Sequence, residues 1–241
     1  MPPVPPPFTP EALKFLRGLK RNNARDWFDP RKAIYERSLK APLLALIDHV
    51  NHHLLDIAPD HVRPPQKTML RIYRDIRFAA DKRPYKTHIS AWWAHTGMPK
   101  TSGAGFYFEL NPTELVLAAG VFMPDRDQLL ALRRHLVAHH ADLRRLLADK
   151  KLRALLPDLE ARPLTRAPKG FSLDDPTVAP ALDLLLHRQW GVSVTLPADQ
   201  ALTPTLFPRI LDTFRRSAPL VALLNQPLAA ALKPRQHRPL F

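Results

Sequence analysis

The chain has 241 residues, contains no cysteine, and carries 36 lysines and arginines against 22 acidic residues, for a formal net charge of +14. The lack of cysteine excludes disulfides, thiolate metal sites and cysteine nucleophiles. No apolar run approaches the roughly 20 residues that a membrane helix needs, and the N-terminus lacks the basic-then-apolar order of a signal peptide. We therefore expect a cytoplasmic protein that has no membrane partner.

The positive charge has two explanations. A basic surface attracts phosphates and nucleic acid. Many of the cations, however, are dispersed along stretches with helical periodicity, where solvated charged faces are common. The chain is also rich in Ala, Leu, Pro and Arg, and such a composition by itself produces an excess of positive charge. Charge alone therefore does not indicate a function.

The N-terminal third predicts helices. Residues 1–8 are rich in proline and predict a disordered tail. A helix is expected to begin at Pro10, with Thr9 as its N-cap. Apolar stripes then predict a short helix around Trp27 and a longer one ending near Leu55, which Pro42 should kink or divide.

The middle of the chain changes to a period of two, which is typical of strands. Residues 69–78 predict a strand with two faces. Residues 87–93 predict a second strand, and residues 105–110 and 114–122 predict a hairpin. The two faces of the first strand would carry Arg71, Tyr73, Asp75 and Arg77 on one side, and Leu70, Ile72, Ile76 and Phe78 on the other.

Helical periodicity returns after Met123. Helices are expected from Pro124, over residues 142–156 and 179–190, and as a pair within residues 203–224 that Pro208 or Pro219 breaks. A fifth strand is expected over residues 191–196. We predict an α+β fold with a central, mainly antiparallel sheet of about five strands flanked by helices. A single domain is expected over residues 9–232, followed by a basic flexible tail over residues 233–241.

Residues 71–86 hold six cationic and two acidic side chains. Arginine forks suit carboxylate or phosphate, and Lys82 or Lys86 would add a compact charge. Asp75 is expected to bond at least one neighbouring arginine, whereas Arg74 falls on the apolar face, where a charge must be paired or lie at a bulge. Two interpretations stay open: an anion-binding site, or a structural ion-pair network that pins the strand to adjacent helices.

Other polar and aromatic side chains at element ends could converge on this cluster. An Arg-lined pocket with aromatic walls would suit a nucleotide or another phosphorylated metabolite. His88 could serve there as an acid or base, although an ordinary strand histidine is the simpler interpretation. The candidate ligand-binding residues are Arg71, Arg74, Asp75, Arg77, Lys82, Tyr85, Lys86, His88, Tyr107 and Lys169.

Several other motifs are discounted. His49 and His53 share i,i+4 spacing, as do His135 and His139, but no carboxylate lies at ligand spacing, so no metal site is predicted. The chain lacks a Walker-type phosphate loop and the elbow of a serine hydrolase. No catalytic residue and no cofactor is assigned.

The cationic stretch resembles the signature of a family. The run Arg71-x-x-Arg74-Asp75-x-Arg77-Phe78-x-x-Asp81-Lys82-x-x-Tyr85 is similar to a motif of the bacterial conserved hypothetical proteins called domain of unknown function 2461. Further similarity runs in the same order from about Phe8 to Leu196, and includes Asn22-Asn23, Trp27-Phe28, Tyr85-Lys86-Thr87-His88 and Pro168-Lys169-Gly170-Phe171. The resemblance implies no activity, because the family has none established.

Two main functional hypotheses and one structural alternative follow. The local density of cations favours a protein that binds an anionic small molecule, bearing phosphate or carboxylate, at the Arg-rich strand. The alternatives are a nucleic-acid-associated basic module that stacks bases on Trp92, Trp93 or Tyr107, and a scaffold with a purely structural ion-pair network. A ligand pocket concentrates cations in a concavity, whereas a nucleic-acid site spreads them along a stripe. The sequence does not specify the ligand, the oligomeric state or whether a reaction follows.

Overall fold

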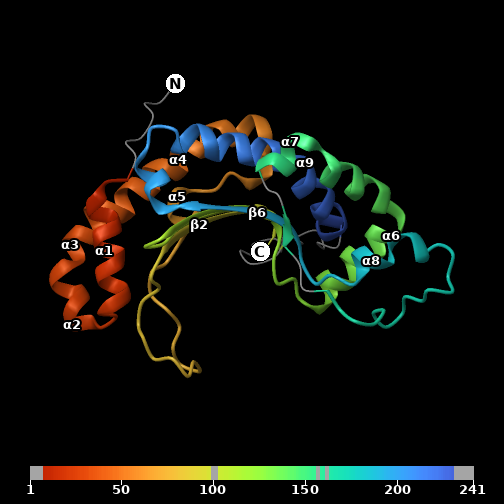
Figure 1. The fold of residues 1–241 in the computed structure, drawn as a ribbon, viewed down its shortest axis with the longest axis horizontal. Helices are drawn as coiled ribbons and strands as arrows, with labels where there is room; N and C mark the ends of the chain where they lie inside the picture. The colour runs from red at the N-terminus through yellow and green to blue at the C-terminus, as the bar shows by residue number, and fades with distance from the viewer. Residues whose placement is uncertain (1–7, 99–102, 156–157, 161–162, 231–241) are drawn as a thin grey trace, which may run out of the picture.

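The computed structural model describes residues 8–98, 103–155, 158–160 and 163–230. These residues form an arch whose roof is an antiparallel sheet (Figure 1). Helices cover the convex face of the roof, and its concave face opens into a hollow between two walls. Residues 1–7 and 233–241, where the sequence predicts tails, lie outside the described residues.

The sheet confirms the α+β prediction. Its strand order is β1-β2-β3-β4-β6-β5, and every neighbouring pair is antiparallel. Four of the expected strands match β2, β3, β4 and β6 to within two residues, whereas β5 was not expected. The strands are β1 (Met69–Leu70), β2 (Ile89–Ala94), β3 (Gly105–Leu110), β4 (Glu114–Val121), β5 (Asp158–Glu160) and β6 (Trp190–Pro197).

The helices occupy the expected regions of the chain but differ in length. In place of the expected pair, α9 is continuous and holds Pro219 and Pro227 inside it. Pro42 is the second residue of α4, directly after a helical turn over residues 36–40, and it does not divide the helical path there. The α-helices are α1 (Pro10–Arg21), α2 (Arg25–Phe28), α3 (Lys32–Tyr35), α4 (Ala41–Ile57), α5 (Pro65–Thr68), α6 (Arg126–Ala148), α7 (Lys150–Leu155), α8 (Leu182–Leu185) and α9 (Leu206–Ala230).

Shorter helical turns connect these elements. The π-helical turn η2 (Glu36–Lys40) joins α3 to α4 without a break in the chain's helical path. The expected helix over residues 179–190 is reduced to one 3-10 turn and the single turn of α8. The 3-10 turns are η1 (Asp29–Arg31), η3 (Pro59–His61), η4 (Ala179–Ala181) and η5 (Ala198–Leu202).

The core lies between the convex face of the sheet and the helices. Trp93 and Phe106 are fully buried, and both contact the Phe214 ring of α9, at centroid distances of 5.2 and 4.9 Å. Phe8, which the sequence places in the tail, is 3% exposed and stacks on Phe108. Because side chains alternate along a strand, the neighbours of these core residues face the hollow.

Residues 71–88 form an arm that leaves the sheet at β1 (Figure 1). The predicted strand over residues 69–78 is therefore wrong beyond Leu70, although β1 does pair with β2 as expected. The arm keeps one isolated bridge, between Tyr73 and Tyr85, flanked by backbone hydrogen bonds from Arg74 to Pro84 and from Lys86 to Ile72.

Local chemistry explains why the strand stops. Pro84 has no N–H to continue a ladder. The carboxylates of Asp75 and Asp81 accept hydrogen bonds from the backbone N–H groups of the residues two positions later, a pattern that favours turns over strands. Phe78, which the alternation places on a buried face, is instead 96% exposed.

The arm is anchored to the N-terminal helices. The Tyr85 ring stacks on Phe28 of α2 with the centroids 4.2 Å apart. The Asn23 side chain donates to the Tyr85 carbonyl at 2.9 Å and accepts from the Tyr85 N–H at 3.0 Å, as a paired strand would. The arm and helices α1–α3 together make one wall of the hollow.

Replacing Asn23 by alanine tests this anchor. Asn23→Ala removes both hydrogen bonds to the arm, and we expect it to lower the free energy of unfolding by about 2 kcal/mol, at about 1 kcal/mol per bond. Urea denaturation gives the measurement. Asn22→Ala is the control, because Asn22 is exposed and its side chain bonds only within its own helix end, to the Gly18 carbonyl. Equal losses in the two variants would contradict the anchor.

Candidate functional site

Most cations of the arm are paired with carboxylates of the arm. Arg77 makes two bonds to Asp75, at 3.0 and 2.8 Å, which confirms the expected role of Asp75 as an internal partner. Arg77 in turn lowers the pKa of the Asp75 carboxyl. Arg83 and Arg74 both bond Asp81, at 2.7 and 2.8 Å. These pairs are partly exposed, so each contributes little to stability but leaves its arginine occupied.

Two further predictions about the arm need correction or refinement. Arg74 does not lie on an apolar face, because the arm is not a strand there; its guanidinium bonds Asp81 and the Arg83 carbonyl. Lys82 donates to the Ile76 carbonyl at 3.1 Å, and so closes the tip of the arm. The ion pairs thus fit the structural interpretation for this part of the cluster.

Arg71 and Lys86 differ from the other cations of the arm. Within the described part of the chain, neither side chain has a hydrogen-bond or ion-pair partner. Burial lowers the pKa of Lys86, and the neighbouring positive charge of Arg71 lowers it further, while Glu109 acts in the opposite direction. Two cations that repel each other at the base of the arm would both be stabilised by a bound anion.

Arg71 also lines a pocket. The pocket has a volume of about 240 Å³ and lies between the base of the arm and η2. Glu36 and Lys40 of η2 form an ion pair at 2.7 Å, so Arg71 supplies the excess charge of the lining. π-helical turns such as η2 occur frequently at functional sites. The lining residues are Tyr35, Glu36, Lys40, Leu44, Gln66, Met69, Arg71, Ile72 and Tyr73.

A second group of polar side chains lies where the arm enters the sheet. His88 Nε2 is 3.6 Å from Glu109 Oε2, and the Tyr107 hydroxyl donates to the same oxygen at 2.6 Å. The Asn111 amide is 3.5 Å from the other Glu109 oxygen. Glu109 lies directly across from Ser90 in the β2–β3 register, which places this carboxylate on the face opposite the core.

Burial controls the protonation of this group. It raises the pKa of the Tyr107 phenol, and the bond to Glu109 adds to the effect, so the phenol keeps its proton and donates it. Burial lowers the pKa of His88, and the charge of Lys86 adds to that effect, whereas Glu109 opposes it. A neutral imidazole beside a carboxylate can accept a proton, so the group can serve as a base next to the cations of the arm.

The remaining candidates lie elsewhere. Tyr85 is buried against Phe28, so its ring anchors the arm instead of facing a ligand. Lys169 is exposed on the segment between β5 and η4, at the opposite end of the arch (Figure 1). The structure therefore brings together Arg71, Lys86, His88 and Tyr107 from the predicted set. It adds Glu109, whose signal in the sequence is a lone carboxylate two residues after Tyr107 in an apolar strand.

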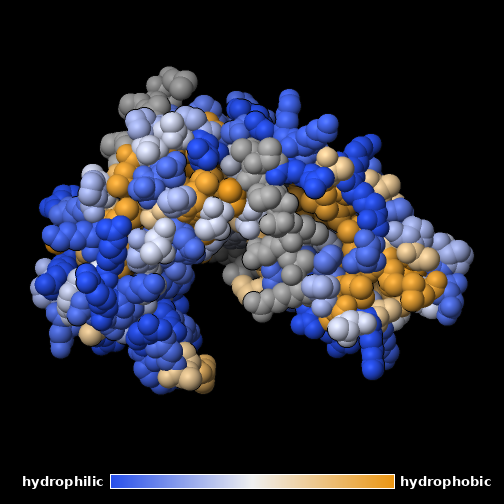
Figure 2. Space-filling view, in the orientation of Figure 1, coloured by the Kyte–Doolittle hydropathy of each residue, from blue (hydrophilic) through white to orange (hydrophobic). Residues whose placement is uncertain are grey.

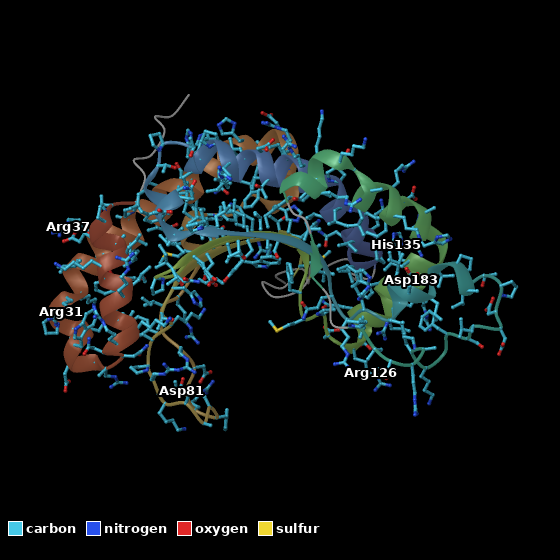
Figure 3. The ribbon with its side chains drawn as sticks, in the orientation of Figure 1. Arg31, Arg37, Asp81, Arg126, His135 and Asp183 are labelled. Carbon is cyan, nitrogen blue, oxygen red and sulfur yellow. The ribbon has the colours of Figure 1, made fainter. Side chains whose placement is uncertain are left out.

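The hollow is open between its two walls. Figure 2 shows it from one side, with a mostly hydrophilic wall formed by the arm and the N-terminal helices. Asp81, on the arm, and Arg126, at the start of α6, lie on opposite walls (Figure 3). Space of this kind admits a ligand larger than the pocket beside Arg71.

Three further features of the described residues bear on other kinds of site. A groove of about 490 Å³ between α4 and α9 is lined mainly by apolar groups, and its Asp56 and Arg215 have opposite charges. Over the described ranges, no three His, Asp or Glu side chains are grouped to hold a metal ion. In those same ranges, no helix has the length and apolar character needed to span a membrane.

The pKa of His88 is measurable by NMR titration of its ring protons. We expect it to lie below the ordinary value of about 6.5. Glu109→Gln should lower it further, because a favourable charge is removed, and Lys86→Met should raise it. Since the folded state binds this proton more weakly than the unfolded chain, the stabilising contribution of His88 is complete above pH 6.5 or so and declines as the pH falls through the lowered pKa. Changes of the opposite sign in the His88 pKa of these two variants would contradict the placement of His88 between Glu109 and Lys86.

A comparison with protein families gives a match that covers most of the chain. A comparison with curated proteins finds none that is similar to the chain. The family described as "Conserved hypothetical protein (DUF2461)" matches residues 11–222, which include α1, the arm, the polar group on the sheet and most of α9. The matched region spans most of the chain and confirms the resemblance seen in the cationic stretch. The protein therefore belongs to the DUF2461 family of conserved hypothetical proteins.

Proposed function

We propose that the protein binds an anionic small molecule, bearing a phosphate or a carboxylate, at the junction of the arm and the sheet. We call this place the junction site and define it by Arg71, Lys86, His88, Tyr107 and Glu109. The observation that carries the proposal is the absence, among the described residues, of a hydrogen-bond or ion-pair partner for the side chains of Arg71 and Lys86. Every other cation of the arm has an oxygen partner.

The electrostatics of the site support an anion. A half-buried lysine beside an arginine is destabilised by desolvation and by repulsion, and the lowered pKa of Lys86 reports both effects. A bound anion would offset both the desolvation of Lys86 and its repulsion by Arg71. Arg71 can hold a phosphate or carboxylate with two parallel bonds, and Lys86 adds a point charge.

Glu109 does not prevent this binding. Its carboxylate accepts a hydrogen bond from Tyr107, and Asn111 and His88 lie beside it, so its oxygens are directed toward groups within the sheet. The acid therefore fixes His88 and Tyr107 in place. A ligand held by Arg71 and Lys86 would lie next to the neutral imidazole of His88, which could then exchange a proton with it.

The proposed anion site lies at the base of the arm, whereas the sequence favours a site along the whole stretch from Arg71 to Arg77. The sequence favours a strand with Arg71, Arg74 and Arg77 side by side, but the ion pairs of Arg74 and Arg77 support a structural role for those two. Arg71 keeps its proposed role as a ligand group. The arm thus combines both interpretations: a network of ion pairs toward its tip and a ligand site at its base.

Thermal unfolding with and without inorganic phosphate tests the junction site. Phosphate at ten times its dissociation constant should stabilise the wild type by about 1.4 kcal/mol, which corresponds to a rise of about 3–6 °C in the melting temperature. Arg71→Ala and Lys86→Ala should remove most of this rise while leaving the phosphate-free melting temperature nearly unchanged.

Arg77→Ala is the matched control. It removes a cation from the same arm, but one that is paired with Asp75 in an exposed place. It should keep the phosphate-dependent rise. A wild type whose melting temperature does not respond to phosphate or to citrate would contradict the proposal, as would equal losses in all three variants.

A further inference from the structure

The concave face of the sheet carries a group of aromatic rings next to the junction site. Trp92 follows Ser90 on the face of β2 that is opposite Trp93 and the core. Its ring centroid lies 6.4 Å from Tyr107 and 6.3 Å from Phe122. Trp92, Tyr107 and Phe122 are each partly exposed. We call Trp92 and Phe122 the aromatic platform.

The Trp92 and Phe122 rings meet edge to face, with an interplanar angle of 74°, and each lies over a glycine of the sheet. A Cβ atom on Gly105 would lie 2.9 Å from the Trp92 ring, and one on Gly191 would lie 2.5 Å from the Phe122 ring. Gly105 is opposite Gly120, which is opposite Gly191, so the three form a row across β3, β4 and β6. The two rings therefore lie close to backbone that carries no side chain, and both residues stay partly exposed on this face.

The platform and the cations lie at a suitable separation. His88 precedes Trp92 by four residues, which at the rise of a strand is about 13 Å between their backbones. Lys86 and Arg71 lie just beyond His88 at the base of the arm. Lys86 lies near enough to Arg71 and Glu109 for their charges to change its pKa, and Glu109 is on the same face of the sheet as Trp92. A ligand with a planar ring at one end and an anion at the other can therefore contact both places.

We propose that the junction site and the aromatic platform together bind a nucleotide. Its base would stack on Trp92 with its edge toward Phe122, and its phosphate would lie between Arg71 and Lys86. This inference rests on the proposed function and adds the class of ligand. Every base has a π face that stacks on aromatic side chains, and cations beside the platform attract the backbone charge. A free nucleotide and a nucleotide within a single strand present the same chemistry, and the open hollow admits either.

Isothermal titration calorimetry on the full chain tests the two halves separately. The probes are inorganic phosphate, adenosine, adenosine 5′-monophosphate and a short oligoadenylate. We expect the monophosphate to bind more tightly than either phosphate or adenosine. Trp92→Ala should weaken monophosphate binding roughly 5- to 150-fold, the range that corresponds to the loss of one stacked base. It should leave phosphate binding unchanged.

Two further variants serve as controls. Trp92→Phe keeps an aromatic ring and should retain most of the affinity for the monophosphate, which also covers the case in which Trp92→Ala does not fold. Phe78→Ala removes a ring that is exposed on the arm, away from the platform, and should have no effect. If Phe78→Ala weakened the binding of the monophosphate as much as Trp92→Ala does, the proposed role of the aromatic platform would be overturned.

The outcomes separate this inference from the proposed function. If Arg71→Ala weakens binding but Trp92→Ala and Trp92→Phe do not, the platform is wrong and the anion site stands. If neither phosphate nor the monophosphate binds, both proposals are overturned. Tighter binding of oligoadenylate with a steep dependence on salt would assign a nucleic-acid strand, and equal affinities would assign the free nucleotide; either result supports the nucleotide.

Discussion

The packing of Trp93 and Phe106 against Phe214 of α9 is the contact on which the site depends. It buries one face of β2 and β3 completely, and the strict alternation of a strand then turns the next side chains toward the hollow. Trp92, Tyr107 and Glu109 have their positions for this reason. A slip of one residue in the register would exchange the two faces, so the core that stabilises the fold also specifies the polar group and the platform.

The charges of the arm fall into two groups with different physical consequences. Exposed ion pairs such as Arg77–Asp75 and Arg83–Asp81 contribute little free energy, because water screens them. The arm is instead held by the Phe28–Tyr85 stack and the Asn23 hydrogen bonds at its base. That division allows the base of the arm to be held in place while the side chains of two of its cations have no hydrogen-bond or ion-pair partner among the described residues.

Sequence patterns predict the sheet better than they predict the site. Period-two alternation identifies β2, β3, β4 and β6, because each pairs along its length with a neighbour. The same alternation fails over the arm, since Pro84 and the local bonds of Asp75 and Asp81 stop a ladder from forming. Lys86 and His88 are recognisable as polar residues next to a strand. The role of Glu109 and the row of glycines depend on which strands are neighbours, and no pattern within a single strand carries that information.

The arm also affects how the sheet ends. An edge strand with a long row of unpaired N–H and C=O groups is a template for pairing with another chain. Here β1 has two residues before the chain leaves the sheet, and β5, at the other edge, has three. Short edges of this kind give a second copy little backbone to continue the sheet. Because the chain leaves the sheet after Leu70, the arm begins there and the junction site lies at its base. The same early end of β1 limits the pairing of further strands that would extend the sheet into an aggregate.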